Sequence, residues 1–323
     1  MSAFACDLLI VIVNFRTPEI VVECLESLLP ELRDTNAQVT VVDNASGDGS
    51  VPMLRTWLAA HGSPAQISLI ESAENAGFAA GNNIGIRSSK ARSYLLLNSD
   101  TLVRPAAIRT LLDAQRSHPK AGLISPRLEW PDGRAQESCF SYHTPASELM
   151  AAAQTAAVDR WLKKYAVGRP VQDVVTSPQW TSFACVLIRH EVFEQVGLLD
   201  EGYFMYFEDV AFCRQAREAG WDIVNVPQAR VVHLRGGSSP VKARVQARKR
   251  LPKYFYESRT RYFFQTYGWA GLTAANVMWW LGRVVSKARQ LLGRSDKASI
   301  QRQWLDIWTN WTAPLRNYTH PQS

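Results

Sequence analysis

The first hundred residues alternate between short apolar runs and longer segments in which apolar side chains recur at helical spacing. The apolar runs cover residues 8–13, 39–42, 67–70 and 94–97. Each is too short for a helix of normal length and is typical of a strand buried on both faces of a parallel sheet. The alternation therefore predicts an α/β fold with a central, mostly parallel sheet and helices on both faces.

Local signals mark several element boundaries in this region. Thr17 is expected to cap a helix that begins at Pro18, and Pro30 is expected to kink or shorten that helix. The glycine-containing residues 75–83 indicate a tight passage that leads into a short helix. The spacing there is neither Gly-x-Gly-x-x-Gly nor a P-loop, so neither dinucleotide nor ATP binding is supported.

The pattern changes after residue 124, where scattered prolines predict long connections. Strand-like runs return at residues 180–189 and 223–233, and Pro227 is expected to break the second run into a strand pair. Residues 207–219 have helical spacing and end before a glycine. The second half therefore predicts a few further strands and helices around long loops.

The predicted strands end in amide or carboxylate side chains: Asn14, Asp43, Asn98 and Asp100. Open α/β sheets bind ligands at the carboxyl ends of their strands. Asn98 and Asp100 are two residues apart and point the same way in an extended backbone. They can meet one small hard cation, which usually brings a phosphate with it. The alternative is a polar turn after a strand, because Asn, Ser and Asp are ordinary turn residues.

Composition places the chain among soluble globular proteins. It has 323 residues, 46% of them hydrophobic and 20% charged, enough for one large or two smaller domains. The five cysteines are scattered without a Cys-x-x-Cys pair, which favours a reducing compartment over a zinc site or a disulfide scaffold. The apolar run 8–13 follows Asp7 and is too short for a signal peptide, so a strand is predicted there.

Charge is distributed unevenly along the chain. Residues 1–233 carry 20 Lys+Arg and 26 Asp+Glu, whereas residues 234–323 carry 16 and 3. The body is therefore mildly acidic and the C-terminal part strongly basic. A basic tail predicts a polyanionic partner, either nucleic acid or an anionic membrane face.

The basic tail also contains a long uncharged segment, residues 262–282, with three tryptophans. Its polar residues and glycines make it a poor bilayer span, although its length is close to that of one. Aromatic-rich apolar surface flanked by Lys and Arg suits a helix that lies in the lipid headgroup layer. The alternatives are a helix that packs on the catalytic body and a nucleic-acid contact. Nucleic acid is disfavoured because no recognition module accompanies the charge.

Five motifs in order carry a family resemblance. They read Val-Asn-Phe; Val-Val-Asp-Asn-Ala-Ser; Asn-Ala-Gly-Phe-Ala-Ala-Gly-Asn-Asn; Leu-Leu-Leu-Asn-Ser-Asp-Thr; and Tyr-Phe-Met-Tyr-Phe-Glu-Asp-Val followed later by Val-Val-His. Across residues 8–265 the chain resembles family 2 glycosyltransferases, in particular the rhamnosyltransferase-like members. The resemblance implies the nucleotide-diphospho-sugar transferase (GT-A) fold.

The expected domain organisation follows from the resemblance and the charge pattern. Residues 1–240 are expected to form the GT-A catalytic domain, with a nucleotide-binding half at 1–124 and an acceptor half at 125–240. Residues 241–323 are expected to form a basic, aromatic-rich helical tail that contacts a membrane surface.

The resemblance implies roles for residues at the strand ends. Substrate-binding roles fall on residues near the nucleotide and donor sugar: Asn14, Asp43, Asn44, Asn75, Gly77, Gly81, Asn82, Asn98 and Trp180. For Asp43 the structural alternative is a cap for the following helix, and for the glycines it is a turn. Trp180 is equally compatible with a core position. Phe183 stands in Ser182-Phe183-Ala184, where the family commonly has a smaller residue.

A divalent cation, Mn²⁺ or Mg²⁺, is the cofactor that the resemblance implies. Asp100 matches the last residue of the family's Asp-x-Asp motif and is expected to be the direct ligand, with Asn98 left as a sugar or ribose contact. His233 ends a late strand and is expected to add an imidazole to the same ion, although a histidine in an apolar strand is usually structural. Imidazole beside carboxylate favours Mn²⁺ somewhat.

The pair Glu208 and Asp209 carries the expected chemistry. The resemblance implies that Asp209 is the base that accepts the acceptor's proton during inverting displacement, while Glu208 positions the acceptor or tunes Asp209. The preceding aromatic run, residues 203–207, is expected to shield the carboxylates from water and raise a pKa. The alternative is a helix N-terminus that carries acidic residues. Asp200 and Glu201 are interpreted as turn and cap residues.

The sequence therefore predicts an inverting glycosyltransferase that uses a nucleotide-diphosphate sugar. The expected acceptor is a glycan or a polyprenyl-diphosphate-linked glycan in cell-envelope polysaccharide synthesis. The expected location is cytoplasmic and peripheral on the inner face of the plasma membrane, with no nucleic-acid partner. The alternatives are a nucleotidyltransferase of similar fold and a non-catalytic membrane-associated protein.

Overall fold

The computed structural model describes residues 4–33, 35–61, 66–234, 241–293 and 300–320. Two units make up the chain. The first comprises Met1–Cys139, Pro170–Glu201 and Phe212–Ser238, and the second comprises Phe140–Arg169, Gly202–Ala211 and Ser239–Ser323. The second unit therefore includes the expected tail together with two segments from the middle of the chain.

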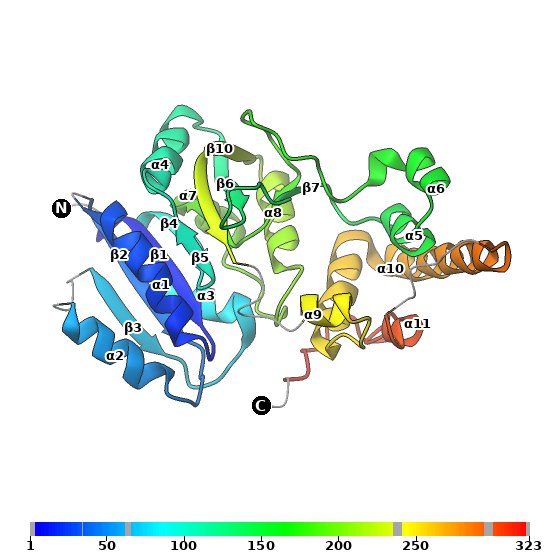
Figure 1. Cartoon of the computed structure of the whole chain (residues 1–323), viewed down its shortest axis with the longest axis horizontal. Helices are drawn as coiled ribbons and strands as arrows, with labels where there is room; N and C mark the ends of the chain where they lie inside the picture. Colours follow the sequence, from blue (N-terminus) through cyan, green and yellow to red (C-terminus); the bar gives the residue numbers. More distant parts are fainter. Residues whose placement is uncertain (1–3, 34, 62–65, 235–240, 294–299, 321–323) are drawn as a thin grey trace. The chain divides into compact units, whose positions relative to one another are not determined.

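An eight-stranded sheet forms the framework of the first unit (Figure 1). Its strands are β1 Cys6–Asn14, β2 Ala37–Asp43, β3 Ile67–Glu71, β4 Ala91–Asn98, β5 Thr101–Val103, β6 Ala121–Glu129, β9 Cys185–Arg189 and β10 Asp222–His233. Their order is β3-β2-β1-β4-β9-β6-β10-β5, and only β9 and β5 run antiparallel to their neighbours. The predicted mostly parallel sheet is confirmed.

Helices cover both faces of this sheet, as the alternating pattern predicts. The helices between strands are α1 Pro18–Leu28, α2 Ser50–Ala60, α3 Gly77–Arg87, α4 Ala107–Ser117, α7 His190–Val196 and α8 Glu208–Glu218. Alternate residues of β1, such as Ile10 and Ile12, share a buried core with α1, α2 and α4. The side chains of Val11 and Val13 point the other way, toward glycines of α3.

Three local predictions about the first unit need correction. Thr17 occupies the position before α1, but its hydroxyl bonds to Asn14 Oδ1 (3.2 Å) and caps nothing. The glycine-containing passage forms the first turns of α3, since this helix begins at Gly77. Pro227 does not divide the last run, because β10 continues through it with a shift in register against β6. Pro30 does end α1, in a 3₁₀ turn at Leu29–Leu32.

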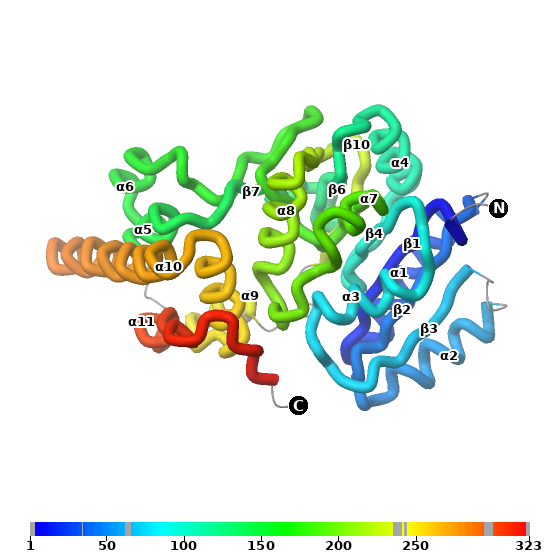
Figure 2. Tube along the Cα trace, turned by 180° about the vertical axis from the view of Figure 1, so that it is seen from behind, coloured from blue at the N-terminus to red at the C-terminus, as the bar shows by residue number. Residues whose placement is uncertain are grey.

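The second unit is helical. Its helices are α5 Pro145–Ala153, α6 Ala156–Trp161, α9 Val241–Gln246, α10 Lys253–Leu291 and α11 Gln303–Asp306. Helix α10 is broken at Gly268, whose φ is +65°. Helix α5 packs closely on α10 because Gly282 has no Cβ; a Cβ there would lie 2.5 Å from Leu149 O. Figure 2 shows α10 between α5 and α11, with its last turns extending beyond both.

Residues 262–282 form an uncharged segment nearly long enough to span a bilayer. Among the described residues, no helix combines the length and the apolar character needed to cross a membrane. Much of this segment is core in the second unit. Tyr262, Phe263 and Leu272 are fully buried, and Trp279 is nearly so.

Candidate active-site residues

Four predicted site residues lie at one edge of the sheet. Asn14 and Asp43 are register partners at the carboxyl ends of β1 and β2. Asn98 ends β4 and pairs with the residue before Asn14. His233 ends β10, which runs in the same direction because β9 lies antiparallel between β4 and β6. The carboxyl ends of four parallel strands thus place these side chains along one edge, where open α/β sheets hold ligands.

Asp43 is held rigidly at this edge. Asn14 Nδ2 donates to Asp43 Oδ2 (2.7 Å), and the Ser46 hydroxyl donates to the same oxygen (2.6 Å). The Ser46 amide donates to Asp43 Oδ1 (3.0 Å). A carboxylate can accept about four hydrogen bonds, so Oδ1 keeps one lone pair for a donor outside this cluster. The carboxylate closes the turn after β2 and does not cap α2, which removes the structural alternative considered for it.

Asn44 connects the end of β2 to the start of α3. Its amide nitrogen donates to Asn75 Oδ1 (2.9 Å) and to the Gly77 carbonyl (3.0 Å). Its buried Oδ1 has no hydrogen-bond partner among the described residues. An unsatisfied buried acceptor costs about 1–3 kcal/mol, so a ligand N–H or O–H donor would stabilise this position.

Gly81 and Asn82, which were predicted to face the ligand, make contacts within the protein. A Cβ on Gly81 would lie 2.9 Å from Val13 Cγ1, so this glycine allows α3 to pack closely against β1. Asn82 is buried, and its amide donates to the Phe78 carbonyl one turn earlier (2.9 Å). Both residues shape the helix that carries Gly77. Gly77 itself has φ of +89°, a conformation that favours glycine.

Asp100 and His233 form the second cluster at the edge. His233 Nε2 lies 3.4 Å from Asp100 Oδ1, and both side chains are buried. The backbone fixes this proximity, because β5 pairs with β10 and Leu234 N donates to the Asp100 carbonyl (2.9 Å). Strand β5 was not predicted from the sequence, and it is the element that brings these two residues together.

The cluster fits a divalent ion that arrives with its own oxygen ligands. Asn98 Oδ1 and His233 Nδ1 are buried and have no hydrogen-bond partner within the described ranges. Those ranges contain no group of three or more His, Cys, Asp or Glu side chains that could hold a metal. One carboxylate and one imidazole suit an ion that is otherwise bound by phosphate oxygens and water.

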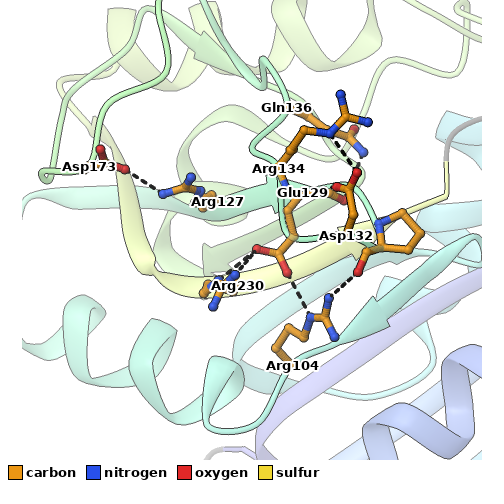
Figure 3. A network of polar contacts seen from close by, with 9 residues as sticks. Arg104, Arg127, Glu129, Asp132, Arg134, Gln136, Asp173 and Arg230 are labelled. Carbon is orange, nitrogen blue, oxygen red and sulfur yellow. Dashed lines mark hydrogen bonds and ion pairs between the residues drawn. The ribbon is translucent and has the colours of Figure 1, made fainter.

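A charged network that the sequence did not reveal supports the end of β10 (Figure 3). The side chain of Glu129 is fully buried and pairs with Arg104 (2.9 Å) and Arg230 (2.8 Å). Gln136 Nε2 donates to the backbone carbonyls of Glu129 (3.0 Å) and His233 (2.7 Å). The network joins β5, β6 and β10 where His233 emerges, and Gln136 bonds to the backbone of His233 there.

The segment after Trp180 lies beside Asn98, since Asn98 N donates to the Ala184 carbonyl (2.9 Å). Trp180 itself is 8% exposed, which makes it predominantly a core residue. The ring of Phe183 is buried and meets the Phe212 ring edge-on at 5.9 Å. The extra bulk at this position is therefore accommodated in the core of the first unit.

In the second unit, the residues before Glu208 adopt an unusual backbone conformation. Tyr206 and Phe207 have φ of +71° and +67°, which bulky side chains rarely adopt. Such strain costs on the order of 1–3 kcal/mol per residue and persists only where the surroundings enforce it. Aromatic contacts hold this conformation. The centroid of the Phe207 ring lies 5.2 Å from that of the His143 ring and 5.5 Å from that of the Tyr262 ring.

The strained turn delivers Glu208 and Asp209 to the first turn of α8. Glu208 is buried, and its Oε2 has no hydrogen-bond partner among the described residues. Burial, and then the negative charge of Asp209, raise the pKa of Glu208 well above its usual value. Asp209 Oδ1 accepts a hydrogen bond from the Val210 amide (2.8 Å). The expected pKa rise thus falls on Glu208, the more deeply buried of the two.

Glu201, interpreted from the sequence as a turn or cap residue, lies in a turn and pairs with α3 instead of capping a helix. Glu201 accepts hydrogen bonds from Asn83 Nδ2 (2.8 Å) and Arg87 Nη2 (3.1 Å), tying its loop to α3. Asp200 precedes this turn. Beside the Phe207 ring, desolvation lowers the pKa of His143 to about 4.

Comparison with known proteins identifies relatives. A family model described as "Glycosyltransferase like family 2" matches residues 6–251. A low-salt glycan biosynthesis hexosyltransferase of Haloferax volcanii is 31% identical over 70% of this chain and 66% of its own length. An N-acetylglucosaminyl-diphospho-decaprenol L-rhamnosyltransferase of Mycobacterium tuberculosis is 29% identical over 66% of this chain. The matched region spans about two thirds of each relative (66% and 67%).

Solved structures support the fold. A mannosyltransferase from Pyrobaculum calidifontis in complex with GDP-Man and Mn²⁺ aligns over 97% of this chain and 86% of its own, with a TM-score of 0.57 and 13% identity. GalNAc-T7 with UDP, GalNAc and Mn²⁺ aligns over 81% of this chain and 51% of its own, with a TM-score of 0.54 and 15% identity. The GT-A fold expected from the sequence is confirmed.

Proposed function

The chain belongs to the family 2 glycosyltransferases, and from this premise we propose that it transfers a hexosyl group, with rhamnose as the favoured sugar, from a nucleotide-diphosphate sugar with inversion. The proposed acceptor is a glycan or a polyprenyl-diphosphate-linked glycan of the cell envelope. The observation that supports this most directly is the row of Asn14, Asp43, Asn98 and His233 along one edge of the sheet. The similarity to a decaprenol-linked rhamnosyltransferase motivates the choice of sugar and acceptor.

The nucleoside end of the donor is assigned to Asp43 and its neighbours. Asn14 and Ser46 hold the Asp43 carboxylate, which leaves one lone pair on Oδ1 for a ribose hydroxyl or a base N–H. Asn44 Oδ1, also buried and unsatisfied among the described residues, is a second acceptor on the same strand end. Asn75 and Gly77 fix Asn44, so they act by positioning it.

The diphosphate end is assigned to Asp100 and His233. These two side chains would hold Mn²⁺ or Mg²⁺ together with oxygens of the donor. When bound, the ion would neutralise the charge that develops on the departing nucleoside diphosphate. Asn98, which ends β4 two residues before Asp100, would contact the ribose or the donor sugar through its unsatisfied Oδ1.

Proton transfer is assigned to the second unit. An oxygen of the acceptor hydroxyl forms a bond to the anomeric carbon, the bond from that carbon to the diphosphate breaks, and Asp209 accepts the hydroxyl proton. A base must be ionised to do this, and Asp209 is the less buried of the two carboxylates, whereas burial raises the pKa of Glu208; we therefore assign the base to Asp209. In its protonated form, Glu208 donates a hydrogen bond that orients the acceptor.

Product analysis tests the proposal. The full-length chain is incubated with a panel of nucleotide-diphosphate sugars, Mn²⁺ and a polyprenyl-diphosphate-linked glycan, and the released products are separated. We expect acceptor-dependent release of nucleoside diphosphate and a change from α to β, or β to α, at the anomeric carbon. Release of pyrophosphate would instead indicate a nucleotidyltransferase, and no turnover with any donor would indicate a binding protein.

A further inference from the structure

One side of the second half of α10 is apolar and exposed. Val284 is 60% exposed, and Leu291 and Leu292 are 90% and 80% exposed. At about 100° per residue, these side chains form a single stripe. We define the α10 apolar face as Val277, Trp280, Leu281, Val284, Leu291 and Leu292, all of them exposed. It extends for about 24 Å along the helix at 1.5 Å per residue.

The opposite side of the same helix is fully used in packing. Ala275, Trp279 and Ser286 are buried, and Gly282 lies against α5. The helix is therefore well anchored in its unit, and its apolar face is left over after that packing is complete. The last turns of α10 also extend beyond α5 and α11 (Figure 2).

Beyond Glu257, the charged side chains of this helix are all basic. Residues 258–295 contain six Lys and Arg and no Asp or Glu. Two of the basic residues, Lys287 and Arg289, lie on opposite flanks of the apolar face by helical spacing. Trp280 lies at one margin, with the exposed Trp304 ring 6.0 Å away. Tryptophans and long basic side chains at the margin of an apolar stripe match the chemistry of a lipid headgroup layer.

From these observations we infer that the α10 apolar face docks onto an anionic lipid bilayer. The inference rests on the proposed function, because a lipid-linked acceptor requires the enzyme to work at a membrane surface. It also moves the expected contact along the chain. Residues 262–282 were expected to lie in the headgroup layer, but most of their large side chains are core. The contact begins at Val277 and continues to Leu292.

A second copy of this chain is the competing occupant of the face. Two such faces packed together would bring basic flanks without acidic partners against each other, which is destabilising. An anionic bilayer supplies the missing opposite charge next to these basic residues. Charge complementarity thus favours lipid over self-association.

Flotation of the full-length chain with vesicles tests the inference. We expect binding to vesicles of equimolar phosphatidylcholine and phosphatidylglycerol, and little binding to phosphatidylcholine alone. Leu281→Glu should reduce the partition coefficient by at least about tenfold, because a buried leucine contributes about 1.5–3 kcal/mol. The matched control is Gln290→Glu, which adds the same charge at an exposed position off the face and should cost no more than about fivefold.

Three outcomes would overturn the inference: no flotation with either vesicle, equal losses in the two variants, or a wild-type dimer that Leu281→Glu dissociates in light scattering. A separate assay with a water-soluble acceptor keeps the proposed function distinguishable. Leu281→Glu should retain full transfer to that acceptor. A chain that floats as expected but transfers no sugar would refute the proposed function and leave the docking surface standing.

Discussion

The sheet edge of the first unit and the turn before α8 in the second hold their carboxylates by opposite means. Three hydrogen bonds from Asn14 and Ser46 hold the Asp43 carboxylate in place. Glu208 lies after a strained aromatic turn, and its buried Oε2 receives no hydrogen bond from the described residues. The first environment suits groups that bind polar ligands, whereas in the second, burial and the charge of Asp209 raise the pKa of Glu208.

The largest effect should come from the second of these regions. Asp209→Asn keeps the shape of the side chain but removes its ability to accept a proton, so we expect kcat to fall by about 10²–10⁴. Nucleotide-sugar affinity, measured by calorimetry, should stay within about twofold. Asp113→Asn, on the exposed surface of α4, serves as the control and should leave kcat unchanged. A near-normal kcat in Asp209→Asn would refute the assignment of Asp209 as the base.

The second largest effect should come from Asp100, at the edge of the sheet, and should concern the metal requirement. Asp100→Asn removes the charge that faces His233, and we expect the Mn²⁺ concentration for half-maximal activity to rise by roughly 10–100-fold. Donor affinity measured without metal should change little, because the nucleoside end is assigned to Asp43 and Asn44 and not to Asp100. The same Asp113→Asn control applies. A change in metal-free affinity as large as the change in Mn²⁺ dependence would contradict the division between the two clusters.

Glu208 allows a test through stability alone. Its raised pKa in the folded state means that the folded protein binds the proton more tightly than the unfolded chain does. The associated stability is fully present below the unfolded pKa of about 4.3 and is lost as the pH rises through the folded value. Glu208→Gln should therefore gain stability relative to wild type on going from pH 5 to pH 8, by about 1.4 kcal/mol for each tenfold by which the folded protein binds the proton more tightly than the unfolded chain.

Urea unfolding at a series of pH values measures this difference. Glu218→Gln, on the exposed end of α8, is the matched control and should show a small difference that stays flat with pH. If Glu208→Gln tracks the wild type at every pH, then the Glu208 carboxyl is not held in its protonated form.

The sequence was informative wherever a pattern is local. The apolar runs predicted the strands, and their polar ends predicted Asn14, Asp43 and Asn98 at one edge, because parallel strands present their carboxyl ends together. The start of α3 was misplaced because Gly77 and Gly81 suggest a loop, and only the contact with Val13 explains a glycine inside that helix.

Non-local and strained features escaped prediction. Glu129 is joined to Arg104 and Arg230 across 25 and 101 residues of sequence, so the network depends on which strands become neighbours. Its only sequence signal is a glutamate at the end of an apolar run. Tyr206 and Phe207 are residue types that avoid positive φ, so no propensity could indicate their conformation.

The smallest effect should come from Gln136, which links that network to the sheet edge. Gln136→Ala leaves the carbonyls of Glu129 and His233 without their amide donor, and we expect unfolding to become easier by about 1–3 kcal/mol. A loosened β10 end should also raise the Mn²⁺ requirement several-fold at unchanged donor affinity, a shift that simple destabilisation does not produce. Gln215→Ala, exposed on α8, should change neither quantity. If Gln136→Ala loses stability but keeps the wild-type Mn²⁺ dependence, then β10 holds His233 in place without this side chain.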